Sequence, residues 1–199
     1  MSTGSEPAGS ERNELRRYFR DKRRSLSEQT QRNNSLHVAR HLLNTGQLLR
    51  GNRFGGYWAN DGEVELGPLL VELDHRRRDI ALPVVNRRGR MGFFRYRPGA
   101  PIVINRYNIP EPAPGAAFIN GRSIDLVLVP LVAFDEFGVR LGMGAGYYDR
   151  YLGSLPVPLR PRVVGVAHEA QRSPDPLPFD DWDVPMDGVV TEHGWQPFD

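Results

Sequence analysis

DLVLVPLVAFDEFGVRLGMGAGYYDRYL, residues 125–152, joins the most apolar run of the chain to a G-x-G-x-G loop. The first half has valine or leucine at nearly every position, which is typical of a strand buried on both faces of a sheet. The second half turns at its glycines into a segment with helical composition. In open α/β sheets ligands bind beyond the carboxyl ends of such strands, so we expect a site at this turn.

The segments on either side alternate between helical and strand patterns. Helices are expected over 11–29, 30–49 and 63–78, and after the loop that begins at residue 144; strands are expected over 53–60, 79–85, 91–98, 124–130, 162–168 and 187–192. Proline and glycine predict long loops at 98–118 and 173–187. We therefore predict a single α/β domain over 11–199, a layered and largely parallel sheet with helices on both faces. Residues 1–10 are expected to form a disordered polar tail.

The composition excludes several classes of protein. The chain has 199 residues, 39% of them hydrophobic, which suits one domain with a real core. It contains no run of eighteen apolar residues and no apolar signal core at its start, so we expect a cytoplasmic protein without a membrane span. With no cysteine, disulfides, thiolate metal sites and cysteine nucleophiles are excluded.

The basic residues are almost all arginines. Of the 26 lysines and arginines only Lys22 is a lysine, and the formal net charge is +2. That charge is too small to indicate a nucleic-acid binder by itself, whereas the arginine fork suits phosphates and carboxylates. Binding of nucleic acid or of an anionic surface through the basic segment Arg12–Arg24 stays an alternative, which a steep salt dependence would support.

The glycine loop has the features of an anion site. Alternate glycines permit positive φ angles and let a ligand approach bare backbone. Arg140 and Arg150 flank the loop and Asp149 follows it, an arrangement that suits a nucleotide phosphate and its Mg²⁺. The loop matches neither the G-x-G-x-x-G dinucleotide motif nor a P-loop. The alternative is a tight strand-to-helix turn that needs glycine only for its geometry.

The stretch also resembles the signature of the 5-formyltetrahydrofolate cyclo-ligases, also called 5,10-methenyltetrahydrofolate synthetases. The family pattern is roughly D-hydrophobic-P-x-x-A-F-D-x-x-G-x-R-L-G-x-G-x-G-Y-Y-D. Other motifs follow in the family's order along most of the chain: ELRRYFRDKRRSLS (14–27), YWANDGEVE (57–65), ALPVV (81–85), IPEP (109–112) and DWDVPMDGVVTE (181–192). Several motifs in order are more specific than any single glycine spacing.

The resemblance implies an ATP- and Mg²⁺-dependent ligase that converts 5-formyltetrahydrofolate to 5,10-methenyltetrahydrofolate, ADP and phosphate. It implies ATP-binding residues Arg12, Arg16, Arg140, Gly142, Met143, Gly144, Ala145, Gly146, Tyr147 and Tyr148; folate-binding residues Trp58, Glu63 and Tyr147; metal ligands Asp149 and Asp183; and Arg140 and Tyr147 as catalytic residues. The expected partner is the folate, with or without a polyglutamate tail. We expect a monomer that binds neither nucleic acid nor membrane.

Each of these residues also has a plainer interpretation. Arg12 and Arg16 suit a solvated helix face, Glu63 suits a helix start, and Trp58 suits the core. Only the order of residues in the closing motif, DWDVPMDGVVTE (181–192), distinguishes Asp183 from the acids near it. A non-catalytic folate or nucleotide carrier of the same fold is the alternative function.

Overall fold

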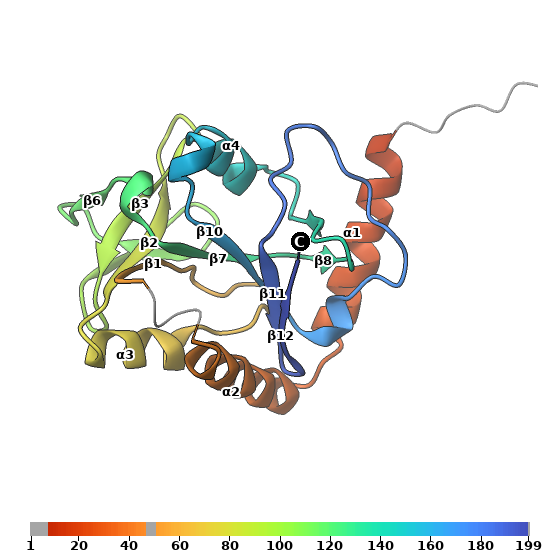
Figure 1. The fold of residues 1–199 in the computed structure, drawn as a ribbon, viewed down its shortest axis with the longest axis horizontal. Coiled ribbons are helices and arrows are strands. Elements are labelled where there is room, and N and C mark those ends of the chain that lie inside the picture. Colours follow the sequence, from red (N-terminus) through yellow and green to blue (C-terminus); the bar gives the residue numbers. More distant parts are fainter. Residues whose placement is uncertain (1–7, 47–50, 199) are drawn as a thin grey trace, which may run out of the picture.

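The computed structural model describes residues 8–46 and 51–198 (Figure 1). The helices are α1 (Ala8–Arg24), α2 (Glu28–Asn44), α3 (Gly67–His75) and α4 (Tyr147–Gly153). The strands are β1 (Arg53–Gly55), β2 (Asp79–Val85), β3 (Met91–Tyr96), β4 (Ile102–Ile104), β5 (Pro110–Pro112), β6 (Phe118–Ile119), β7 (Leu126–Pro130), β8 (Ala133–Phe134), β9 (Arg140–Leu141), β10 (Arg162–Val166), β11 (Gly188–Thr191) and β12 (Gly194–Pro197). Short 3-10 helices lie at Gly121–Ser123 (η2), Val157–Leu159 (η3) and Glu169–Gln171 (η4).

One eight-stranded sheet forms the centre of the molecule, in the order β12-β11-β10-β7-β1-β2-β3-β6. The five strands from β11 to β2 pair in parallel, and β12, β3 and β6 add antiparallel edges. The predicted α/β class with a largely parallel sheet is confirmed. β7, the strand of the opening stretch, lies inside the sheet between β1 and β10.

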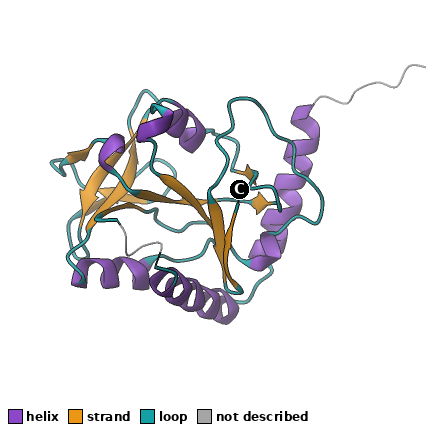
Figure 2. Ribbon diagram, in the orientation of Figure 1, coloured by secondary structure: helices purple, strands orange, loops and turns teal. Residues whose placement is uncertain are grey.

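Helices cover both faces of this sheet (Figure 2). Successive side chains of β7 point to opposite faces of the sheet and so divide the core in two. Leu126 and Leu128 pack with α2 and α3 on one face. Val127 and Val129 pack with Leu152 of α4 on the other. α1 lies beside the sheet, where Phe19 packs in a third cluster against the β8–β9 hairpin. That placement brings the basic face of α1 to the carboxyl end of β7.

The element boundaries differ from the predicted ones for identifiable reasons. α1 ends at Arg24 because Ser27 caps a new helix, its side chain accepting from the Thr30 N–H at 3.1 Å. α3 begins only at Gly67, with a proline in its first turn, so residues 63–66 belong to a loop. The first strand ends at Gly55 rather than residue 60, and β12 was not predicted at all.

Two further predictions concern regions of weak sequence signal. The 98–118 segment is a loop with short extended pieces, as expected, since it contains β4 and β5. α1 begins at Ala8, inside the stretch expected as a tail, and residues 1–7 lie outside the described ones. α2 ends at Asn44, and the expected helix end at residue 49 also lies outside them.

Candidate active site

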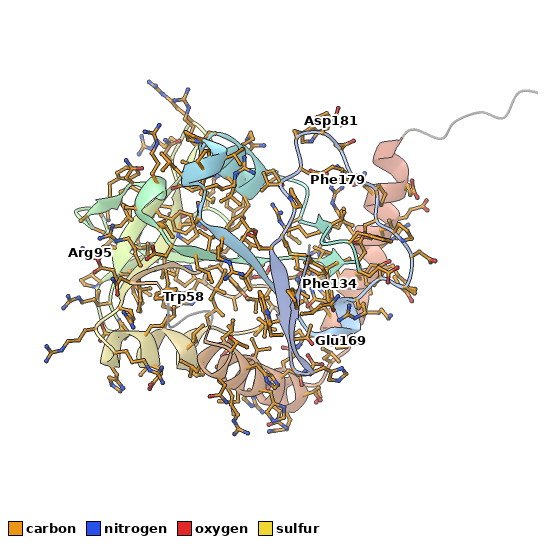
Figure 3. All side chains as sticks on the ribbon, in the orientation of Figure 1. Trp58, Arg95, Phe134, Glu169, Phe179 and Asp181 are labelled. Carbon is orange, nitrogen blue, oxygen red and sulfur yellow. The ribbon has the colours of Figure 1, made fainter. Side chains whose placement is uncertain are left out.

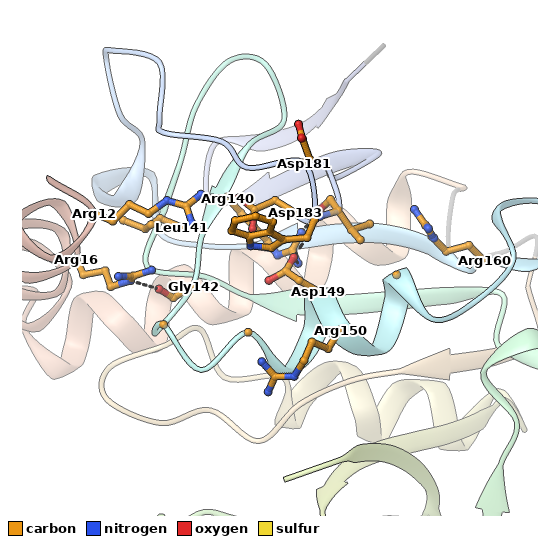
Figure 4. A pocket seen from close by; sticks show the side chains of 15 residues that line it. Arg12, Arg16, Arg140, Leu141, Gly142, Asp149, Arg150, Arg160, Asp181 and Asp183 are labelled. Atoms are coloured by element: carbon orange, nitrogen blue, oxygen red, sulfur yellow. Dashed lines mark hydrogen bonds and ion pairs between the residues drawn. The ribbon is translucent and has the colours of Figure 1, made fainter. Parts of the chain in front are cut away.

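A pocket of about 610 Å³ opens beside the glycine loop (Figure 4). α1, the end of β9, α4 and the 178–184 loop form its walls. Its lining residues are Arg12, Arg16, Arg140, Leu141, Gly142, Gly144, Gly146, Asp149, Arg150, Gly153, Arg160, Asp181, Trp182, Asp183 and Val184. Arg12 and Arg16 lie at one end, Arg160 lies at the other, and Asp149 and Asp183 lie between them. The pocket therefore places two carboxylates inside a set of guanidinium groups.

Asp135, which sequence reasoning missed, shapes the hairpin that leads into the pocket. Its side chain is 1% exposed, and one oxygen accepts from the N–H groups of Phe137 and Val139 at 2.9 and 3.0 Å. The other oxygen accepts from the Leu177 N–H at 2.9 Å. Asp135 thus joins the β8–β9 turn to the loop that carries the closing motif. Its place after A-F in the family pattern was the available signal.

Arg140 and Asp149 form an ion pair on the floor of the pocket. The Arg140 side chain is only 5% exposed, and its guanidinium donates to Asp149 and to the carbonyl of Val184. The Asp149 carboxylate also accepts from the Val184 N–H at 3.2 Å. β9, α4 and the closing motif therefore meet at this pair.

Arg12 and Arg16 are not a solvated helix face. Arg12 pairs with Asp180 at 2.6 Å and with Asp183 at 2.5 Å, and it donates to the carbonyl of Pro178 at 3.0 Å. Arg16 donates from Nε to the Gly142 carbonyl at 2.9 Å. Burial lowers the pKa of Arg16, and the positive charge of Arg12 lowers it further. α1 is thereby fixed both to the glycine loop and to the closing motif.

Two of the glycines in the loop have backbone conformations that disfavour a side chain. Gly144 has φ +95° and Gly146 has φ +61°, whereas Ala145 is not in this region. A Cβ at Gly144 would lie 3.4 Å from the Arg16 guanidinium carbon. α4 has only 7 residues, so the surrounding arginines rather than a long helix dipole make the pocket attractive to anions.

We expect Gly144→Ala to destabilise the fold by about 1–2 kcal/mol, because alanine is strained at positive φ. Gly142→Ala is the matched control, since no atom lies within 4 Å of its Cβ position and its φ is not positive. That control should be neutral or slightly stabilising. Urea unfolding of both variants measures the difference. Equal stability of the two would contradict the strained-loop interpretation.

Arg150 and Arg160 complete the cationic wall; Arg150 was expected to flank the anion loop, whereas the expected site did not include Arg160. The Arg150 guanidinium lies 5.3 Å from the centre of the Tyr147 ring. The Nε of Arg160 is buried and has no hydrogen-bond partner among the described residues. Buried donors without a partner are uncommon in folded proteins. Arg160 follows a proline-rich segment without a recognisable pattern, so no sequence signal identified it.

The expected folate residues do not share this pocket. Trp58 packs edge-on against Tyr96, with ring centres 5.6 Å apart, and lines a separate hollow of about 250 Å³. Figure 3 shows it apart from Phe179 and Asp181. The Tyr147 hydroxyl lies 2.7 Å from that of Tyr107, in the β4–β5 loop, and this hydrogen bond lowers the pKa of Tyr147.

Tyr148 and Glu63 are buried near one another. The Tyr148 hydroxyl is buried and has no hydrogen-bond partner among the described residues; burial raises its pKa, and the charge of Glu63 adds to the effect. Glu63 lies 3.6 Å from the fully buried Arg23 and is 11% exposed. Burial raises the pKa of Glu63 to about 7, although Arg23 opposes the shift. Near neutral pH this carboxyl is therefore poised between its two protonation states.

The raised pKa of Glu63 predicts a pH-dependent stability. Because its folded pKa of about 7 exceeds the unfolded value of roughly 4.3, its contribution is fully present below pH ~4.3 and is lost as pH rises through ~7. Between pH ~4.5 and ~8 the loss amounts to about 3 kcal/mol. Glu63→Gln should remove this loss, as urea unfolding at the two pH values would measure. Parallel pH profiles for the two proteins would contradict it.

Asp149 and Asp183 fit a magnesium site only in part. Both carboxylates line the pocket, and each pairs with an arginine, Arg140 or Arg12. Within 8–46 and 51–198, no group of three or more metal-binding side chains is preformed. Mg²⁺ is usually held by one or two carboxylates together with substrate phosphates and water. These two residues fit an ion that arrives with a phosphate ligand.

Comparisons with known proteins agree with the fold and with the position of these motifs. The chain is 33% identical to the 5-formyltetrahydrofolate cyclo-ligase of Escherichia coli (strain K12), over 87% of this chain and 96% of that protein. It is 31% identical to the 5-formyltetrahydrofolate cyclo-ligase of Haemophilus influenzae, over 90% of this chain and 96% of that protein. The NMR structure of Aquifex aeolicus 5,10-methenyltetrahydrofolate synthetase matches with a TM-score of 0.82 and 34% identity, over 94% of this chain and 92% of that one.

The family profile covers the elements that build the pocket. It extends over residues 8–192, from the start of α1 to the end of the closing motif. No helix among the described residues is long and apolar enough to cross a membrane. The chain belongs to the 5-formyltetrahydrofolate cyclo-ligase family and is an enzyme of the ligase class.

Proposed function

We propose that this ligase uses ATP and Mg²⁺ to close 5-formyltetrahydrofolate to 5,10-methenyltetrahydrofolate, with release of ADP and phosphate. One observation carries the proposal: a single pocket contains Arg12, Arg16 and Arg140, the glycine loop, and the carboxylates of Asp149 and Asp183. The names of the relatives support the folate substrate. The arginines that line the pocket support an anionic co-substrate.

The reaction requires activation of a poor leaving group. The oxygen of the formyl group on N5 attacks the γ-phosphorus of ATP, and ADP leaves. N10 then attacks the formyl carbon, its proton is lost, and the C–O bond breaks to release phosphate. Positioning and charge neutralisation are enough for such a step, so no protein nucleophile is needed.

The present ion pairs would exchange partners when the nucleotide binds. Arg12 and Arg140 would turn from Asp183 and Asp149 to the phosphates, with Arg16 and the N–H groups of residues 142–148 as further donors. Asp149 and Asp183 would then hold Mg²⁺, which supplies positive charge at the phosphate oxygens. Each charge keeps a partner throughout, which limits the desolvation cost.

The folate contacts stay predictions that rest on the family motif. Glu63, half-protonated near neutral pH, is suited to hydrogen-bond the polar edge of a pterin. Trp58 would give an aromatic wall, and Tyr147 would lie between folate and phosphate. Trp58 lines a separate hollow, whereas Tyr147 stands beside the pocket, so the proposal requires the folate to extend from the loop that joins β1 to α3 toward the start of α4. Cytoplasmic location, a monomeric state and use of polyglutamylated folate are also predictions.

The test is a spectrophotometric assay of the purified protein with 5-formyltetrahydrofolate, Mg²⁺ and ATP. It follows the near-ultraviolet band of the methenyl product, with ADP measured in parallel. One ADP per methenyl product, and no product without ATP, is the expected result. Folded protein that binds folate tightly but consumes no ATP would contradict the proposal and favour a carrier.

A further inference from the structure

Trp182 is an aromatic side chain that the expected site did not include, although it lines the arginine-rich pocket. It is 70% exposed, and within the described part of the chain no other aromatic ring stacks on it. Trp58 and Trp195, by contrast, pack against a core cluster. An exposed indole on a loop at a charged pocket is better explained by a ligand than by folding, because burial would otherwise stabilise it.

The backbone on both sides of Trp182 is fixed. Before it, Arg12 binds the Pro178 carbonyl and the Asp180 carboxylate. After it, Asp183 pairs with Arg12 and accepts from the Asp180 N–H at 3.0 Å. Val184 continues the loop, donating to Asp149 and accepting from Arg140. These contacts place the loop that carries Trp182 beside the groups expected at the phosphates.

We propose that Trp182 binds the nucleobase of the nucleotide by stacking. A wall of guanidinium groups with an exposed indole beside it matches a ligand that combines anionic groups with an aromatic ring. The pocket, at about 610 Å³, has the volume of a small-molecule site. The inference rests on the proposed use of ATP and adds the residue that contacts its adenine base. Stacking accepts any purine, so GTP should depend on Trp182 as ATP does.

The experiment compares ATP with inorganic tripolyphosphate, which has the phosphates but no base. Isothermal titration in Mg²⁺ buffer would be carried out on the wild type, Trp182→Ala, Trp182→Phe and Phe179→Ala. Phe179 is the matched control, because it is 49% exposed on the same loop and does not line the pocket. Quenching of tryptophan fluorescence by ATP is the second measurement, in the wild type and in Trp182→Phe.

Trp182→Ala should weaken ATP binding roughly tenfold or more and leave tripolyphosphate binding within about twofold. Trp182→Phe should retain most of the ATP affinity but lose the quenching, and Phe179→Ala should match the wild type. Equal losses for ATP and tripolyphosphate, or no loss for either, would overturn the stacking role alone. A wild type that binds neither compound would overturn the proposed function as well.

Discussion

Asp149→Asn is expected to lower kcat/KM for ATP-dependent ring closure by roughly 10²–10³-fold. The change removes a carboxylate proposed to hold Mg²⁺, and it leaves Arg140, which is 5% exposed, without its counter-charge. An arginine in that state would bind the phosphates in a different position. Steady-state assays over a range of ATP and Mg²⁺ concentrations measure the loss. Excess Mg²⁺ should not restore the rate, because the ligand itself is absent.

Two further variants make the first result interpretable. Asp183→Asn should also reduce turnover strongly, and it should fold normally because Arg12 keeps Asp180 as a partner. Asp21→Asn, on the exposed side of α1, makes the same charge change away from the pocket and should have the activity of the wild type. Near-normal rates for both Asp149→Asn and Asp183→Asn would contradict the metal assignment.

Asp61→Asn should destabilise the protein by about 3 kcal/mol, a larger effect than any other substitution considered for folding. Asp61 accepts from Arg20 at 3.0 Å and from Arg23 at 2.7 Å, and it also pairs with Arg24. Arg23 is fully buried, so loss of the Asp61 carboxylate leaves its charge with Glu63, at 3.6 Å, as the remaining counter-charge. Asparagine suits the positive φ of +55° at this position, which limits the change to the charge.

The pH dependence of that loss gives a second check. Burial acts to raise the pKa of Asp61, but hydrogen bonds from Arg20, Arg24 and Arg23 outweigh it and lower the pKa below the ordinary value. A depressed pKa gives stability that is present above the unfolded value of roughly 3.9 and is lost as pH falls through the folded value. The difference in unfolding free energy between the wild type and Asp61→Asn should therefore shrink below pH ~4.

Arg24→Gln, at a half-exposed arginine that also pairs with Asp61, should lower the free energy of unfolding by less than about 1 kcal/mol. Equal losses for the two variants would contradict the buried-charge interpretation.

The sheet could be predicted from the sequence because its strands are continuous apolar runs. Residues 79–85 form β2 with the predicted limits, and β7 and β10 lie inside the predicted strands. β12 could not be predicted, because G-W-Q-P has little strand character and pairs only at an edge of the sheet. The helix over 63–78 was predicted too long, because apolar residues before the proline pack into the core from a loop.

The parts of the site that lie within sequence motifs could be predicted. The loop 142–146 and Asp149 lie together because they are sequence neighbours, and the family motif added Arg12 and Asp183 from distant segments. Arg160, Trp182 and Asp135 depend on how separate loops fold against one another. Arg160 stands in no motif or periodic pattern. Asp135 and Trp182 stand within the family motifs, but only the tertiary structure shows where they lie at the site.

The most direct test of the account is a reaction with 5-formyltetrahydrofolate labelled with ¹⁸O in its formyl oxygen. The phosphate formed with ATP and the purified protein would be analysed by ³¹P NMR for the isotope shift. Phosphorylation of the formyl oxygen predicts one ¹⁸O atom in every phosphate released, in step with methenyl product. Phosphate without ¹⁸O, while the methenyl product still accumulates, would contradict the proposed chemistry.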